Sequence, residues 1–317
     1  MALLNPPETL PGVARVLFRA LQAADGFGLP KDELAASVAP AALPRGERAA
    51  PGPGSRGFDH TLAACLTISL FERDGDVIRL HPGLPDSARD RRRRDQEFRP
   101  LVCDLVLADA VNHGLWDSSE GARDLTRALA FYLAQNPLRP PGPWNDPDGV
   151  DVAQERQFRA GEVIFSNDTR WGAFDRWATF LGFGSRLPRS CQLTRDKDVL
   201  VPDPTEVIRR VIPLELTGQR QEISVVVERL SQRIPVLDGG SYRREVEAKM
   251  KPETIRGSAE ELSPSLAHAL LRLRGEQVIV LEDLADAPLK VRLPEGFGPG
   301  RTITHASLAD RNRRASR

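Results

Sequence analysis

One design is written three times along this sequence: an amphipathic helix, a short break, and then two strand-like runs around a tight turn. The three copies span residues 58–80, 169–201 and 263–293. A helix that leads into a β-hairpin is the second half of a winged helix-turn-helix, a module that binds nucleic acid or other proteins and seldom does chemistry. A repeat at this scale constrains the fold more than any local pattern does. We therefore expect a fold that is mainly α with small β wings (α+β), built as tandem winged helix-turn-helix modules around a central helical segment.

Local signals support the individual elements of this repeat. Pro11 is placed to start a first helix, and the dipeptide Asp74-Gly75 is a strong hairpin signal, because both central positions of such a turn require positive φ. Asn167-Asp168 predicts the N-cap of the second copy's helix, and Ser263 predicts that of the third. In the third copy, residues 277–281 and 289–293 are the expected hairpin strands.

Breaks between these patterns divide the chain into five expected parts. The clearest linker is residues 137–150 (PLRPPGPWNDPDGV), because proline and glycine dominate it. The parts are an N-terminal winged-helix domain (1–86), a helical segment with its linker (87–150), a second winged-helix domain (151–215), a C-terminal winged-helix-like domain (216–300) and a flexible basic tail (301–317).

The composition is that of an ordinary soluble globular protein. The 317 residues contain 44 Lys and Arg against 44 Asp and Glu, so the net charge is zero. This balance argues against a domain that coats nucleic acid by bulk charge, while leaving room for a local basic patch. Three widely spaced cysteines suit a reducing cytosol. With no signal peptide and no apolar run of membrane-spanning length, we expect a cytoplasmic protein.

No motif in the sequence is a strong catalytic signature. There is no phosphate-binding loop, and Gly182-Phe-Gly184 reads as the end of a helix rather than a dinucleotide fingerprint. The five histidines never pair at ligand spacing, and the cluster of Asp146, Asp148 and Asp151 lacks the order of a calcium loop. We therefore predict no enzyme activity, no cofactor, no metal and no small-molecule ligand.

A DNA-binding role depends on polar side chains along the helices and near the first wing, where base and phosphate contacts arise. The first copy's helix carries few such residues, and the second copy's helix carries more. The helical spacing of Trp171, Phe174 and Trp177 favours a core stripe over base stacking. The arginine run after residue 88 either contacts DNA phosphates or forms the solvent-exposed start of a helix. The candidate DNA contacts are Arg56, His60, Arg91, Arg92, Arg93, Arg94, Asn167, Thr169, Arg170 and Arg176.

Several segments resemble the DpdG family. The likeness is carried by residues 167–171 (NDTRW), 174–184 (FDRWATFLGFG) and 201–205 (VPDPT), with further similarity in residues 3–11 and 125–135. Proteins of that family are encoded in bacterial gene clusters that put 7-deazaguanine bases into DNA and restrict unmodified DNA. The resemblance implies a role in phage defence beside helicases and nucleases. It supplies no catalytic residue to carry over.

Together these observations predict a non-catalytic winged-helix subunit, or adaptor, of a phage-defence DNA modification and restriction system. It would contact duplex DNA, dock partner enzymes such as a helicase, ATPase or nuclease, or do both. One alternative is a purely protein-binding scaffold for an ATPase or helicase, which the neutral net charge and the apolar helix faces favour. A second alternative is a transcriptional regulator, which requires a more basic recognition surface than this sequence offers.

Overall fold

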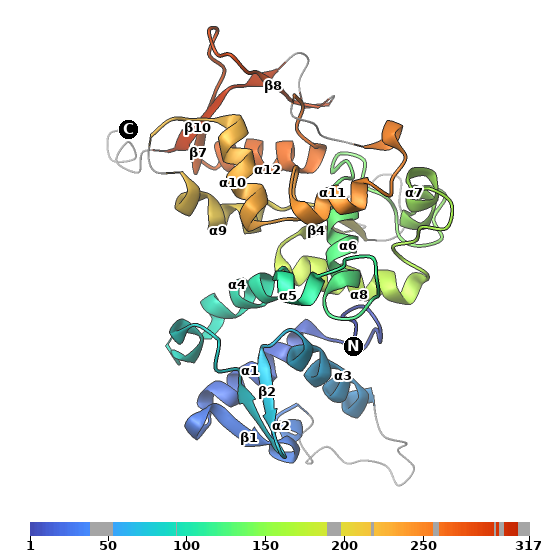
Figure 1. The fold of residues 1–317 in the computed structure, drawn as a ribbon, viewed down its shortest axis with the longest axis vertical. Helices are drawn as coiled ribbons and strands as arrows, with labels where there is room; N and C mark the ends of the chain where they lie inside the picture. The colour runs from blue at the N-terminus through green and yellow to red at the C-terminus, as the bar shows by residue number, and fades with distance from the viewer. Residues whose placement is uncertain are drawn as a thin grey trace. The chain divides into compact units, whose positions relative to one another are not determined.

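The chain has a mixed α+β fold of helices and small antiparallel sheets, as predicted (Figure 1). The computed structural model describes residues 1–38, 53–92, 94–188, 198–216, 219–255, 260–294, 296–297 and 301–309. The chain divides into two compact units, each built from two segments. Unit 1 comprises Met1–Thr126 and Asn167–Leu181, and unit 2 comprises Arg127–Ser166 and Gly182–Arg317.

Unit 1 opens with a three-helix and three-strand arrangement. Its elements are α1 (Pro11–Ala23), β1 (Gly28–Pro30), α2 (Lys31–Ala36), α3 (Pro53–Thr67), β2 (Phe71–Asp74) and β3 (Val77–Leu80), with the short 3-10 helix η1 (Asp25–Phe27) before β1. The strands form an antiparallel sheet in the order β1-β3-β2. Gly75 has a φ of +60° in the β2–β3 turn, which confirms the hairpin predicted from Asp74-Gly75.

The local sequence explains these elements. Pro11 begins α1, whose residues Ala14, Leu17, Phe18 and Leu21 are buried at helical spacing. The helix α3 starts at Pro53, ahead of residue 58, where the first copy was expected to begin. Residues 39–52 lie outside the described residues.

The second copy's helix is also part of unit 1. This helix, α8 (Asp168–Leu181), packs with α1 and α4 (Arg94–Val106). Trp171, Phe174 and Trp177 are buried, which confirms that the aromatic stripe belongs to a core. The remaining elements of unit 1 are η2 (Asp86–Arg89), α5 (Asp109–Asn112) and the start of α6 (Arg123–Tyr132), which ends in unit 2.

Asp124 anchors the N-terminal segment to the start of α6. Its carboxylate accepts hydrogen bonds from the backbone N–H groups of Leu3 (3.2 Å), Leu4 (2.7 Å) and Leu125 (2.8 Å). The side chains of Leu3 and Leu4 are fully buried. A single carboxylate therefore binds a backbone N–H group in the first turn of α6 and at the same time fixes the first residues of the chain into the core of unit 1.

Unit 2 contains a second three-stranded sheet, in the order β6-β10-β7. Its helices are α7 (Val150–Gln157), α9 (Thr205–Glu215), α10 (Ile223–Arg233), α11 (Ser241–Glu247), the 3-10 helix η4 (Pro252–Thr254) and α12 (Pro264–Gly275). Its strands are β4 (Gly184–Leu187), β5 (Val199–Pro202), β6 (Gln221–Glu222), β7 (Ile279–Glu282), β8 (Val291–Arg292), β9 (Thr302–Ile303) and β10 (His305–Leu308). The pairs β4–β5 and β8–β9 are separate antiparallel hairpins.

The hairpin predicted for the third copy has the wrong return strand. Strand β7 pairs with β10, from Ile279 opposite Leu308 to Glu282 opposite His305, and not with residues 289–293. Residues 291 and 292 instead form β8, which pairs with β9, so that Val291 lies opposite Ile303. Residues 302–308, which we had assigned to the basic tail, thus form β9 and β10, and the β-branched pair Thr302-Ile303 fits that state.

The second copy is divided between the two units. Its helix α8 belongs to unit 1, whereas its hairpin β4–β5 belongs to unit 2 and begins at Gly184, directly after the helix. Residues 189–197, between the two strands, lie outside the described part of the chain.

The two units share one order of elements. In unit 1 the order is α1-β1-α2-α3-β2-β3, with the sheet β1-β3-β2; in unit 2 it is α9-β6-α10-α12-β7-β10, with the sheet β6-β10-β7. In both sheets the first strand pairs with the last, and the last pairs with the second. Unit 2 adds α11 before α12 and the β8–β9 hairpin between β7 and β10.

Candidate functional site

The two predicted DNA contacts on α3, Arg56 and His60, differ in exposure and in their contacts with other residues. Arg56 is exposed near the start of the helix. His60, one turn further on, is half-buried, and its Nδ1 lies 3.4 Å from a carboxylate oxygen of Glu8. In this helix only Arg56 therefore offers an outward-facing cation among the predicted DNA contacts.

Of the predicted arginine run, the structure describes the side chains of Arg91 and Arg92. Arg91 donates through Nε to the carbonyl oxygen of Gln22 (2.8 Å) and through Nη2 to that of Ala24 (3.2 Å), so it binds the end of α1. Arg92 is exposed. Arg93 and the side chain of Arg94 lie outside the described residues.

Polar residues of the second copy also form hydrogen bonds within unit 1. The side-chain oxygen of Asn167 accepts a hydrogen bond from the backbone N–H of Arg170 (2.9 Å), which confirms the predicted N-cap of α8. The hydroxyl of Thr169 donates to Asp168 (3.1 Å), and Nη2 of Arg176 donates to the carbonyl oxygen of Pro7 (2.7 Å). Arg170 itself is half-buried. These residues hold α8 and the N-terminal segment in place.

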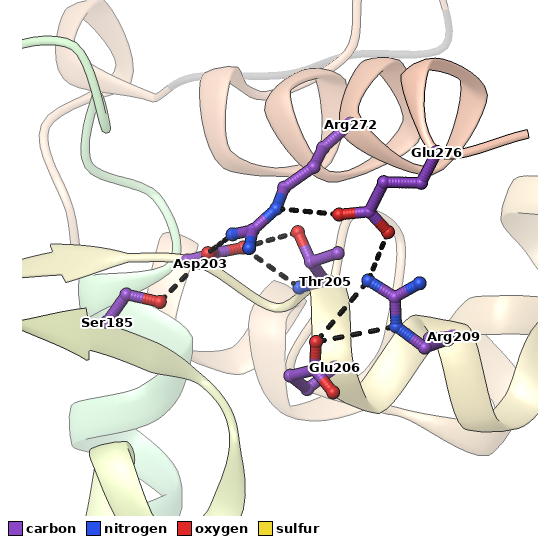
Figure 2. Close-up of polar contacts among 7 residues, drawn as sticks. All are labelled: Ser185, Asp203, Thr205, Glu206, Arg209, Arg272 and Glu276. Carbon is purple, nitrogen blue, oxygen red and sulfur yellow. Dashed lines mark hydrogen bonds and ion pairs between the residues drawn. The ribbon is translucent and has the colours of Figure 1, made fainter.

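In unit 2, a chain of alternating charges connects α9 with α12 (Figure 2). Asp203 accepts a hydrogen bond from Arg272 (2.7 Å), and Nε of Arg272 donates to one oxygen of Glu276 (3.1 Å). The other oxygen of Glu276 pairs with Arg209, which also pairs with Glu206 (3.4 Å). None of these five residues was among the predicted site residues.

Asp203 is the buried end of this chain of charges. One of its carboxylate oxygens accepts from the backbone N–H and the hydroxyl of Thr205, and the other accepts from Ser185 (2.9 Å) as well as Arg272. Burial acts to raise the pKa of Asp203, but the hydrogen bonds from Thr205 and Ser185 and the charge of Arg272 outweigh it, so its pKa lies below the ordinary value. Asp203 thus stays ionised and ties β4, α9 and α12 together.

Side chains on the polar face of α12 contact other parts of unit 2. Ser265, His268 and Arg272 share that face at helical spacing. The hydroxyl of Ser265 donates to the carbonyl oxygen of Leu133, the ring of His268 lies 6.4 Å from that of Phe297, and Arg272 binds Asp203. The opposite, apolar face is buried in the core. At the C-terminal end of α12, Arg272 and Arg274 are exposed.

The family was identified by comparison with known proteins. A family model described as DpdG-like matches residues 1–287. The chain belongs to the DpdG-like family. This membership confirms the resemblance predicted from the sequence and connects the protein with the 7-deazaguanine DNA modification system. No match was found among curated proteins or among solved structures.

The residues matched by the family model cover all of unit 1 and most of unit 2. The match ends at residue 287, after β7 and before β8. The charged chain from Asp203 to Glu276 lies inside the matched region, whereas β10, the central strand of the second sheet, lies beyond it. The fold of unit 2 therefore depends on a strand that the family match does not include.

Within its described part, this DpdG-like protein holds no group of three or more His, Cys, Asp or Glu side chains placed to bind a metal ion. Cys65 and Cys103 are buried, and burial raises the pKa of the Cys65 thiol, so this sulfur is held as the weakly nucleophilic thiol. None of the described helices is both long enough and apolar enough to cross a membrane.

Proposed function

We propose that this DpdG-like protein is a non-catalytic winged-helix subunit of a phage-defence system that modifies and restricts DNA, contacting duplex DNA and docking partner enzymes. The observation that carries the proposal is the element order shared by the two units. A helix, a strand, two further helices and a hairpin, with the first strand paired to the last, is the arrangement of a winged helix-turn-helix. Such modules place their last helix against DNA or against a partner protein.

In unit 1 the helix in the recognition position is α3. Arg56 is exposed near its N-terminal end, where recognition helices contact DNA, and Arg92 is exposed after the β2–β3 hairpin. Both guanidinium groups suit contacts to phosphate oxygens, which position a protein on DNA without reading its sequence. The α3 end of unit 1 is therefore the proposed DNA-contacting surface.

A titration of a labelled duplex at about 50 and 200 mM salt tests this surface. Each phosphate contact contributes about −0.9 to the slope of log affinity against log salt, so Arg56→Ala and Arg92→Ala each reduce the steepness of the slope by about that amount. Arg139→Ala removes one exposed charge from unit 2 and serves as the matched control. If the wild-type chain does not bind at about 50 mM salt, the DNA-contacting part of the proposal is wrong.

A pure protein scaffold is the second candidate function. The internal contacts of Ser265, His268 and Arg272 on α12 favour it, since they occupy polar groups that could otherwise face a DNA groove. Purification of the full-length chain from cells that express the neighbouring defence genes tests this function. A stoichiometric helicase, ATPase or nuclease that remains bound at high salt supports the scaffold, and recovery of the chain alone contradicts it.

A further inference from the structure

Two arginines from different helices of unit 2 grip one carboxylate. Glu276 presents one oxygen to Nε of Arg272 on α12 and the other to Nη2 of Arg209 on α9 (Figure 2). A fork of this kind suits any planar or tetrahedral oxyanion, because guanidinium donors match the spacing of carboxylate and phosphate oxygens. The two guanidinium groups therefore form an anion-binding site, and the anion that occupies it is the carboxylate of Glu276.

The two ends of the charged chain differ in accessibility. The side chain of Asp203 is 4% exposed, whereas those of Glu276, Arg209 and Arg272 are 36%, 32% and 44% exposed. Asp203 is also fixed by Ser185 and the start of α9. Asp203 is thus part of the framework, and Glu276 is the member that solvent and ligands can reach.

The position of Glu276 on its helix disfavours a negative charge, which weakens it as a partner of Arg209 and Arg272. It is the C-cap residue of α12, where the helix dipole disfavours negative charge and favours cations such as Arg272 and Arg274. Ion pairs between exposed side chains contribute little net stability. A phosphodiester carries the same single negative charge as the carboxylate and matches the same guanidinium donors, so it competes with Glu276 for the two arginines.

The order of elements places Arg272 on the helix that would meet DNA. In a helix-turn-helix the last helix lies in the groove, and α12 has this position in unit 2, with α9 packed against it. We propose that Arg209 and Arg272 form a phosphate-binding site for duplex DNA, which Glu276 closes in the unbound protein. This inference rests on the DNA-contacting part of the proposed function.

The test compares Glu276→Gln with Glu245→Gln in the full-length chain. Both variants remove one negative charge from unit 2, but Glu245 is an exposed residue of α11, outside the charged chain. Affinity for a labelled duplex is measured at about 50 and 200 mM salt. Two freed arginines make the slope of log affinity against log salt steeper by about 1.8 for Glu276→Gln. The ratio of its affinity to that of Glu245→Gln therefore falls about 12-fold between about 50 and 200 mM salt.

A second substitution shows whether the gain comes from this site. Adding Arg209→Ala to Glu276→Gln removes one of the two guanidinium groups without uncovering Asp203, and we expect about half of the added salt slope to disappear. Equal binding by Glu276→Gln and Glu245→Gln, or a gain that Arg209→Ala leaves intact, overturns the inference. If the wild-type chain binds and the two Glu variants are equal, only this inference fails. If neither the wild-type chain nor Glu276→Gln binds, the proposed DNA contact fails with it.

Discussion

Replacement of Asp124 by alanine is expected to loosen the N-terminus of the chain and to destabilise unit 1. The substitution leaves the backbone N–H groups of Leu3, Leu4 and Leu125 without their acceptor. A buried donor without a partner costs about 1–3 kcal/mol. If the segment detaches instead, the exposure of two buried leucines costs about 1.5–3 kcal/mol for each. Because the chain takes the cheaper route, we expect a loss of about 3–5 kcal/mol.

Urea unfolding followed by tryptophan fluorescence measures this loss. Trp116, Trp171 and Trp177 all lie in unit 1, so the emission reports mainly on that unit. With a slope of about 2 kcal/mol per molar urea, the midpoint falls by about 1.5–2.5 M. Asp124→Asn keeps one acceptor oxygen and should lose about half as much. A midpoint for Asp124→Ala within about 0.3 M of the wild type would refute the anchoring role of this carboxylate.

Other substitutions test the packing and electrostatics of each unit. A methyl group at Gly240 would lie 2.2 Å from the carbonyl oxygen of Pro235, so Gly240→Ala should destabilise unit 2 by about 1–3 kcal/mol, seen as a lower melting temperature. Gly12 faces open space in α1, so Gly12→Ala should stabilise unit 1 by about 0.5–1 kcal/mol, and a lower melting temperature would contradict this. Because the folded pKa of Asp203 is lowered, its contribution is present above its unfolded pKa of about 3.9 and is lost as pH falls through the lower folded value. The stability of Asp203→Asn, measured by urea unfolding from pH 7 to pH 3, should therefore depend less on pH than that of the wild type.

Local signals predicted much of unit 1. Helical spacing and Pro11 predicted α1, and Asp74-Gly75 predicted the β2–β3 hairpin, because these features depend on neighbours in sequence. Strand β1 was missed. A Gly-Leu-Pro segment has no alternating pattern, and it becomes a strand only by pairing with β3, about fifty residues further along the chain.

Pairing between distant segments also explains what sequence patterns could not decide in unit 2. Residues 289–293 and 302–308 both suit a strand and both contain buried side chains, so only the pairing in the fold identifies residues 305–308 as the partner of β7. The same limit applies to the sites. Arg91 and Arg176 are basic residues in the sequence, but backbone carbonyl groups bind them in the fold. The pair Arg272 and Glu276 has the helical i, i+4 spacing, whereas the contact with Arg209 arises only when α9 packs on α12.

The shared order of elements does not give the two units the same surface, and the difference bears on how each would meet DNA. In unit 1, Arg56 on α3 is exposed, so a phosphate could reach it without displacing another group. In unit 2, the corresponding helix α12 carries Arg272, whose donors are already held by Asp203 and Glu276. A contact there requires one anion to replace another. Wild-type binding should therefore report on unit 1, and the additional salt dependence of Glu276→Gln should report on unit 2. What surrounds each helix, rather than the helix itself, then decides which unit contacts DNA first.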